Sequence, residues 1–195
     1  DSEANNFYLK PKILTLGYSY LSSTPLTVSA QPCLNQVSQI LGESCSLAVL
    51  EQDEVLYISR SQTSRVMSIA LNAGSRLPAY CTSLGRIMLA SLAPADLDAY
   101  LNRVALRPHT DRTVVSEERL REILAEIRQQ GFAVVEEELE IGLRSIAVPV
   151  RGATGTVVAA LNVGAQATRV SRAQMEQAFL PVLLNAAAEL SVLLP

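Results

Sequence analysis

Two stretches in the C-terminal part of the chain, at 143–150 and 156–163, alternate between apolar residues and polar or small ones. This alternation predicts two β-strands, and the glycine-containing link at 151–155 predicts that they form an antiparallel hairpin. Small or polar side chains stand at four hairpin positions where a packed core would hold branched aliphatics: Ser145, Ala147, Ala160 and Asn162. Because protein cores are close-packed, these gaps predict room for a ligand.

Apolar residues at helical spacing predict six helices. Five lie at 10–22, 83–92, 94–103, 117–130 and 171–194, and one more, after the first, ends at residue 41. The helix that ends at Gly42 is expected to direct four side chains inward: Leu34, Val37, Ile40 and Leu41. Pro32 either kinks this helix or marks its start. Ser116 and Gly131 bound the helix at 117–130 by an N-cap and a C-terminal stop.

Four further strands are predicted at 45–50, 55–59, 65–71 and 132–135, and residues 77–82 and 106–115 are expected to be loops. Ser171 and Gln174 form a capping-box pattern at the start of the last helix, which Pro181 is expected to kink or split. Helices and strands follow no βαβ rhythm, so the pattern favours an α+β fold with an antiparallel sheet.

The composition describes a globular chain of 195 residues with 49% hydrophobic residues and a mean hydropathy of +0.22. No apolar run approaches the roughly 18 residues of a membrane span, and the first residues do not resemble a signal peptide. Three cysteines match no zinc spacing and suggest a reducing, cytoplasmic setting. With a net charge of −3 and no basic cluster, this chain lacks the electrostatic footprint of a DNA-binding surface.

Three separated segments, at 12–23, 73–86 and 136–150, resemble the effector-binding domain of IclR-type bacterial transcriptional regulators. The last segment carries Gly-Leu-Arg-Ser-Ile-Ala-Val-Pro-Val after an acidic run. The resemblance extends over nearly the whole chain, from about residue 9. It is strongest to the branch that controls protocatechuate, 4-hydroxybenzoate and β-ketoadipate metabolism, and it implies a GAF-like sheet flanked by helices.

This resemblance divides the chain into residues 1–23, the end of a DNA-binding domain with its linker helix, and residues 24–195, the effector-binding domain. It implies a non-catalytic sensor that needs no cofactor or metal and binds a small carboxylic acid of aromatic catabolism. The acid would shift the balance between two arrangements of domains or subunits. Such regulators are homodimers or homotetramers. They bind DNA through a winged helix-turn-helix, and this chain is expected to begin after it.

The segment before the helix at 83–92 is the first candidate part of a binding site. Thr82 or Ser83 can serve simply as an N-cap, but the first N–H groups of a helix also favour a carboxylate. In the family, the backbone at positions matching Ser83 and Leu84 binds a small acid, although the residues there are often Gly and Ala. Tyr80 and Thr82 could add hydroxyl donors, or Tyr80 could be an exposed loop aromatic.

The hairpin supplies the second candidate part. Ser145 and Asn162 match polar positions that line the family's pocket, or they only satisfy hydrogen bonds within the sheet. Strand alternation places Arg144 on the opposite face from Ser145, so an ion pair with the acidic run at 136–140 is preferred over direct contact with the ligand. Val135 matches a position that is Asp in some relatives, and it would make that wall apolar.

Three further features of the sequence each admit two interpretations. Met67 is either a core residue or a flexible ligand wall. The acidic run is expected to be mainly a solvated face, with Glu138 the member that turns inward. A Cys81–His109 nucleophilic pair would make the chain an enzyme fragment, but His109 lies in a polar loop with nothing to orient it. A GAF-like binding module of a signalling protein is the alternative to the regulator.

Overall fold

The computed structural model describes residues 10–13, 15, 25–63 and 71–192. Its helices are α2 (Pro25–Leu41), α3 (Ser83–Ala90), α4 (Pro94–Arg103), α5 (Glu117–Gln130), α6 (Arg172–Gln174), a π-helix (Met175–Phe179) and α7 (Leu180–Val192). Its strands are β1 (Ser44–Glu51), β2 (Glu54–Ser61), β3 (Arg76–Pro78), β4 (Ala133–Glu136), β5 (Leu143–Arg151) and β6 (Val157–Gln166). No helix within these described ranges is long and apolar enough to cross a bilayer.

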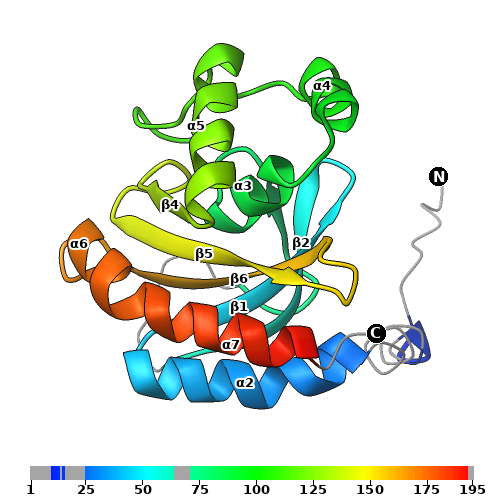
Figure 1. The fold of residues 1–195 in the computed structure, drawn as a ribbon, viewed down its shortest axis with the longest axis vertical. Helices are drawn as coiled ribbons and strands as arrows, with labels where there is room; N and C mark the ends of the chain where they lie inside the picture. The colour runs from blue at the N-terminus through cyan, green and yellow to red at the C-terminus, as the bar shows by residue number, and fades with distance from the viewer. Residues whose placement is uncertain (1–9, 14, 16–24, 64–70, 193–195) are drawn as a thin grey trace, which may run out of the picture.

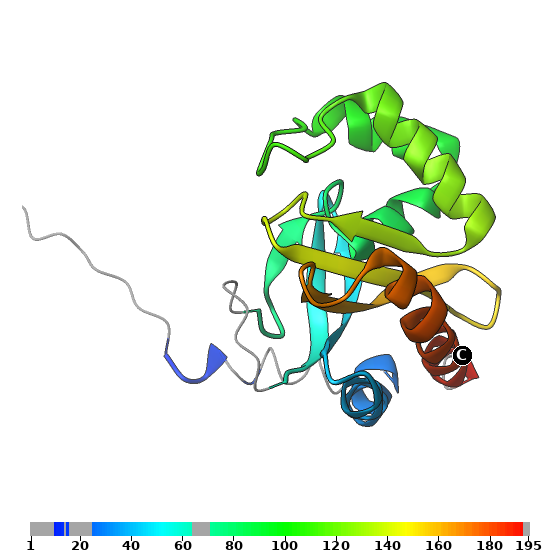
Figure 2. The same cartoon turned by 90° about the vertical axis from the view of Figure 1, so that its left-hand side faces the viewer.

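The strands form one antiparallel sheet in the order β3-β2-β1-β6-β5-β4. The sheet has helices on both sides: α2 and α7 lie along one face, and α3, α4 and α5 lie over the other (Figures 1 and 2). Of these, α3 packs directly on β5 and β6. The arrangement confirms the predicted α+β fold with an antiparallel sheet.

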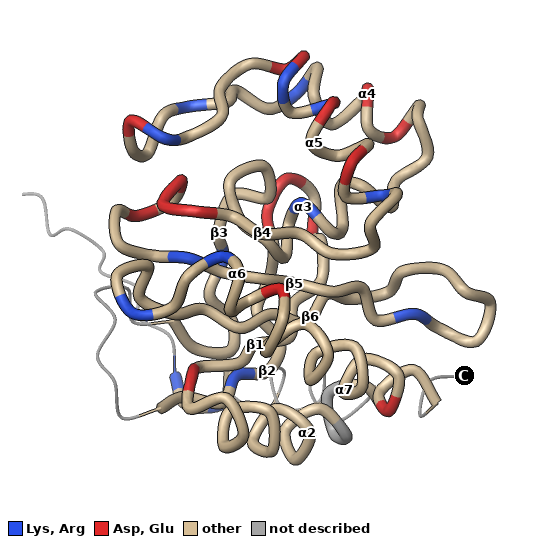
Figure 3. Tube along the Cα trace, turned by 60° about the vertical axis from the view of Figure 1, so that its left-hand side comes forward, with Lys and Arg blue, Asp and Glu red and all other residues tan. Residues whose placement is uncertain are grey.

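The two faces of the sheet carry different side chains. Large aliphatic residues cover the face toward α2 and α7: Leu47, Ile146, Val148, Leu161 and Val163. Alanines face α3 on the other side: Ala48, Ala147 and Ala160. The helices over the two faces also differ in charge, because α2 contains no charged residue whereas α5 carries several (Figure 3).

Most predicted element boundaries are confirmed within a few residues, and α4 and α5 agree at both ends. Ser116 accepts a hydrogen bond from the Arg119 N–H, and the capping box of Ser171 and Gln174 is present. Pro181 is preceded by a π-helical turn in which the Leu180 N–H bonds to the Met175 carbonyl. The proline therefore alters the helix without ending it, since π-bulges are one way a helix accommodates an irregularity.

Two predictions need correction, one open alternative is decided, and others cannot be compared. Ile40 was expected to face inward but is 59% exposed, because it lies on the outer side of α2. The segment at 77–82 is not all loop, since β3 pairs with β2 there. Pro32 lies inside α2, on its solvent side, so the helix does not begin at it. The strand at 65–71, Met67 and most of the helix at 10–22 fall outside the described residues.

Candidate functional site

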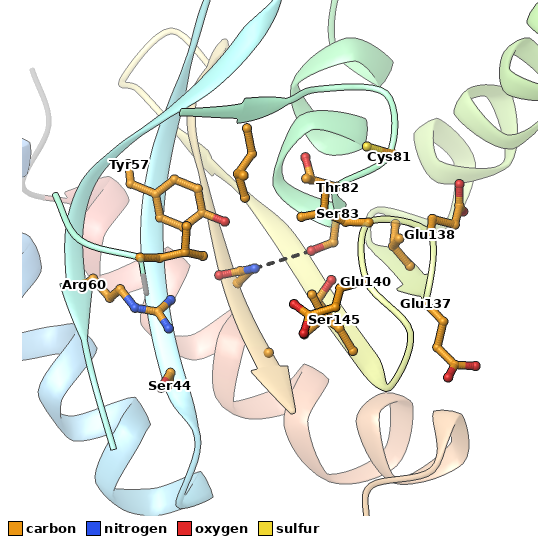
Figure 4. Close-up of a pocket in the computed structure, with 17 residues that line it drawn as sticks. Ser44, Tyr57, Arg60, Cys81, Thr82, Ser83, Glu137, Glu138, Glu140 and Ser145 are labelled. Atoms are coloured by element: carbon orange, nitrogen blue, oxygen red, sulfur yellow. Dashed lines mark hydrogen bonds between the residues drawn. The ribbon is translucent and has the colours of Figure 1, made fainter. Parts of the chain in front are cut away.

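A cavity lies between the start of α3 and the face of the sheet that carries the small side chains (Figure 4). Its volume is about 650 Å³ when the space open to solvent is included. All six strands, the α3 N-terminus and the acidic loop after β4 supply most of its wall. The lining residues are Ser44, Tyr57, Arg60, Leu71, Leu77, Cys81, Thr82, Ser83, Val135, Glu137, Glu138, Leu139, Glu140, Leu143, Ser145, Asn162 and Gly164.

Arg60 of β2 is a cation on the cavity wall without a carboxylate partner among the described residues. Its Nη1 donates to the Ser46 hydroxyl at 2.7 Å, and its Nε is buried with no hydrogen-bond acceptor in the described part of the chain. Burial lowers the pKa of the guanidinium from its usual value, but an arginine stays charged. An anion that enters the cavity could therefore accept a hydrogen bond from the Arg60 Nε–H, which no described residue accepts.

The start of α3 forms another part of the wall. Thr82 is its N-cap and accepts from the Gly85 N–H at 3.2 Å. A Cβ on Gly85 would lie 2.1 Å from the Ala79 carbonyl oxygen, so only glycine lets the helix approach that segment so closely. Ser83 is fully buried and its hydroxyl accepts from Asn162 Nδ2 at 3.5 Å. The helix N-terminus thus presents positive partial charge to the cavity.

The acidic loop is fixed by ion pairs on two of its three cavity-lining carboxylates. Glu138 forms a buried pair with Arg86 of α3 at 2.6 Å and accepts from the Val114 N–H at 2.9 Å. Glu137 pairs with Arg112 and accepts from the Gly142 N–H. Glu138 was predicted to turn inward, and its burial confirms this.

Glu140, the third carboxylate of this loop to line the cavity, differs from the other two. Its Oε2 is buried and has no hydrogen-bond partner among the described residues, and Glu140 forms no ion pair there. Asn162 Oδ1, on β6, is likewise buried without a partner. The cavity therefore presents both an unsatisfied cation and two unsatisfied acceptors.

The predicted site residues divide into three groups. Five of them line the cavity: Thr82, Ser83, Val135, Ser145 and Asn162. Three others lie elsewhere: Tyr80, Leu84 and Arg144. The Leu84 side chain is fully buried in the core under α3, while its backbone lies in the first turn of the helix. Met67 belongs to the part of the chain that the structure does not describe.

Arg144 and Tyr80 point away from the cavity for identifiable reasons. The Arg144 Nε donates to Glu136 at 2.6 Å, and its Nη1 donates to the carbonyls of Ala167 and Val170. This is the ion pair with the acidic run that strand alternation favoured. The Tyr80 hydroxyl donates to the Arg107 carbonyl at 2.7 Å, so it ties down the loop at 106–115.

Sequence reasoning missed Tyr57, Arg60 and Glu140 as lining residues. Tyr57 and Arg60 lie on β2, outside the three matching segments, and the sheet order brings β2 to the cavity. Burial raises the pKa of the Tyr57 phenol to about 12, so its hydroxyl stays protonated near neutral pH. One signal was present, since Arg60 is a charged residue directly after the predicted strand at 55–59.

The described residues do not support the nucleophile hypothesis. The Cys81 thiol is buried, which raises its pKa to about 12, and the Glu138 carboxylate adds to the rise. His109 contacts the Tyr80 hydroxyl at 3.1 Å and not Cys81. A thiol with a raised pKa is a poor nucleophile. In the part of the chain that the structure describes, no group of three or more His, Cys, Asp or Glu side chains could bind a metal ion.

Comparison with known proteins identifies the family. The profile described as "Bacterial transcriptional regulator IclR C-terminal" matches residues 18–192. The Pca regulon regulatory protein of Pseudomonas putida is 50% identical over 190 residues, which are 97% of this chain and 65% of that protein. The p-hydroxybenzoate hydroxylase transcriptional activator of Acinetobacter baylyi is 34% identical over 195 residues, covering 97% of this chain and 72% of that protein.

A solved structure shows the same fold. The inducer-binding domain of the Acinetobacter transcription factor PobR, as a double mutant with 3-hydroxybenzoic acid, has a TM-score of 0.79 and 34% identity. The match covers 83% of this chain and 95% of that one. These relatives are transcriptional regulators, which agrees with a non-catalytic sensor and not with an enzyme or signalling-enzyme module. This chain belongs to the IclR family of bacterial transcriptional regulators and corresponds to their C-terminal, effector-binding part.

Proposed function

We propose that the cavity binds a small carboxylic acid of aromatic catabolism, such as protocatechuate, 4-hydroxybenzoate or β-ketoadipate, with Arg60 as the carboxylate partner. The observation that carries this proposal is the buried guanidinium nitrogen that has no acceptor among the described residues. A guanidinium matches a carboxylate in geometry as well as charge. The α3 N-terminus, with Thr82 and Ser83, would favour the same anion from another wall.

The lining of the cavity agrees with this ligand class. Apolar side chains of Leu71, Leu77, Leu139 and Leu143 contribute to the wall together with Val135, which suits a ring or an aliphatic chain. The PobR domain, which shares this fold, is described in complex with 3-hydroxybenzoic acid. The relatives named for the Pca regulon and for p-hydroxybenzoate hydroxylase support regulation of aromatic catabolism.

The acid would act by stabilising one arrangement of the protein over another. The acidic run at 136–140 is joined to α3 through Glu138 and to α6 through Glu136, which contacts Arg172 at 3.4 Å. A ligand against this run can therefore bias the positions of both helices. In the full regulator, residues 1–23 would connect this domain to a DNA-binding domain, and a homodimer or homotetramer would transmit the change to DNA.

Thermal unfolding of the chain with a panel of acids tests the proposal. The panel is protocatechuate, 4-hydroxybenzoate, β-ketoadipate, muconate and pyruvate. An acid present at 100 times its Kd should stabilise the fold by about 2.7 kcal/mol, which raises Tm by a few degrees. Arg60→Met should abolish the shift, whereas Arg76→Met, at an exposed arginine on β3, should retain it.

Two results would contradict the proposal. One is the absence of a shift with every acid in the panel. The other is a shift that Arg60→Met leaves unchanged, which would place the carboxylate elsewhere.

A further inference from the structure

The cavity contains acceptors that a carboxylate cannot satisfy. Asn162 is 9% exposed, and its Nδ2 is occupied by the Ser83 hydroxyl while Oδ1 has no donor. The Oε2 of Glu140 is buried and equally without a donor among the described residues. An ionised carboxylate accepts hydrogen bonds only, so whatever satisfies Glu140 must bring a donor.

The neighbouring carboxylates show that this lack of a partner is specific to Glu140. Glu137 and Glu138 lie in the same loop and line the same cavity, yet each has an arginine partner and a backbone N–H donor. The charges of the loop are therefore balanced within the protein except at Glu140. In Figure 4, Glu140 and Arg60 point toward the same space from different sides of the cavity.

Taken with the proposed function, on which this inference rests, the two unpaired groups define a ligand with two different ends. A carboxylate would pair with Arg60, and a hydroxyl hydrogen would be donated to Glu140 or Asn162. Leaving a buried acceptor unpaired is costly, so an acid without a hydroxyl should bind more weakly. An acid with a second carboxylate in place of the hydroxyl offers no donor at neutral pH, and its charge would repel Glu140.

We infer that Glu140 and Asn162 read a hydroxyl group on the effector, so that the cavity selects hydroxylated aromatic monocarboxylic acids over unsubstituted acids and dicarboxylic acids. Within the acids considered above, this favours protocatechuate and 4-hydroxybenzoate over β-ketoadipate and muconate. Glu140 would then determine specificity, while Arg60 would provide affinity for any acid.

Isothermal titration calorimetry with a graded set of acids tests this inference. The set is benzoate, 3-hydroxybenzoate, 4-hydroxybenzoate, protocatechuate and β-ketoadipate, each titrated into the wild-type chain and into Glu140→Gln. In the wild type, at least one hydroxylated acid should bind about tenfold or more tighter than both benzoate and β-ketoadipate. In Glu140→Gln this preference should shrink to within about threefold, because the charged acceptor and the repulsion are both removed.

Glu54→Gln, at a half-exposed glutamate on β2 that does not line the cavity, is the matched control and should behave as the wild type. Equal binding of benzoate and every hydroxylated acid by the wild type would overturn the inference, whether or not the variant folds. So would tighter binding of β-ketoadipate than of any hydroxylated acid, or an unchanged preference in Glu140→Gln. If acids bind and require Arg60 but show no hydroxyl preference, only this inference fails. If no acid binds, the proposed function fails with it.

Discussion

The two faces of the central sheet are built on the same strands but differ in how completely they are filled. Toward α2 and α7, β5 and β6 present Ile146, Val148 and Leu161, all fully buried. Toward α3, the residues that alternate with these are Ser145, Ala147 and Asn162. One face therefore forms a close-packed layer, and the other combines a close approach of α3 with a cavity.

The comparison shows how one hairpin can serve stability and binding separately. Aliphatic burial is non-directional, and it stabilises the fold wherever the side chains fit together. The cavity wall instead holds buried polar atoms of Arg60, Glu140 and Asn162 that have no partner among the described residues. This arrangement costs stability unless a ligand completes it. Changes on the two faces should consequently have effects of different kinds.

The largest expected effect on stability comes from the filled face. Leu161→Ala should lower the free energy of unfolding by about 2–5 kcal/mol, because the side chain is fully buried and its removal leaves a void. Ser145→Ala, on the cavity face of the paired strand, should change it by less than about 1 kcal/mol. Urea denaturation monitored by circular dichroism measures both, and similar losses for the two variants would contradict the distinction between the faces.

An intermediate effect is expected from pH at the cavity wall. Burial raises the pKa of the Cys81 thiol from 9.0 to about 12, so the folded chain keeps a proton that the unfolded chain releases. The stabilisation is complete below pH 9 and is lost as pH rises through 12. At pH 10 the loss from this group should be about 1.4 kcal/mol. Comparison of denaturation at pH 8 and pH 10 should show a smaller decrease in Cys81→Ala; an identical decrease would contradict the assignment.

The smallest effect on stability should come from Gly164→Ala, which nonetheless changes binding. A Cβ there would lie 3.7 Å from Leu143 Cδ1, an ordinary contact, and it would occupy part of the cavity wall. The free energy of unfolding should stay unchanged or rise by about 0.4–1 kcal/mol, as for a glycine replaced without strain. Calorimetry should show weaker acid binding than in Val158→Ala, an exposed position on the same strand. Undiminished affinity would show that Gly164 does not limit the cavity.

Local signals account for what could be predicted correctly. Caps at Ser116 and Ser171, the glycine stop at Gly131 and the strand alternation around Ser145 depend on residues within a few positions of one another. Alternation also placed Arg144 opposite Ser145 and led to its ion pair with the acidic run. The prediction that Ile40 faces inward was wrong, because an apolar residue near a helix end does not by itself show which side of the helix packs against the sheet. Tyr80 is held by backbone groups of Arg107, 27 positions later, which no local pattern reveals.

The sequence by itself determined the family resemblance, the α+β class, the helix boundaries and the presence of small residues on one face of the hairpin, since these depend on short-range spacing. Only the tertiary structure decided which charged groups remain unpaired. Glu138 finds Arg86 at a separation of 52 positions, whereas Glu140, two residues later, finds no ion-pair partner among the described residues. Ion pairing depends on distances across the fold, and strand order and helix packing set those distances. The same acidic run therefore contains both a structural ion pair and the proposed determinant of specificity.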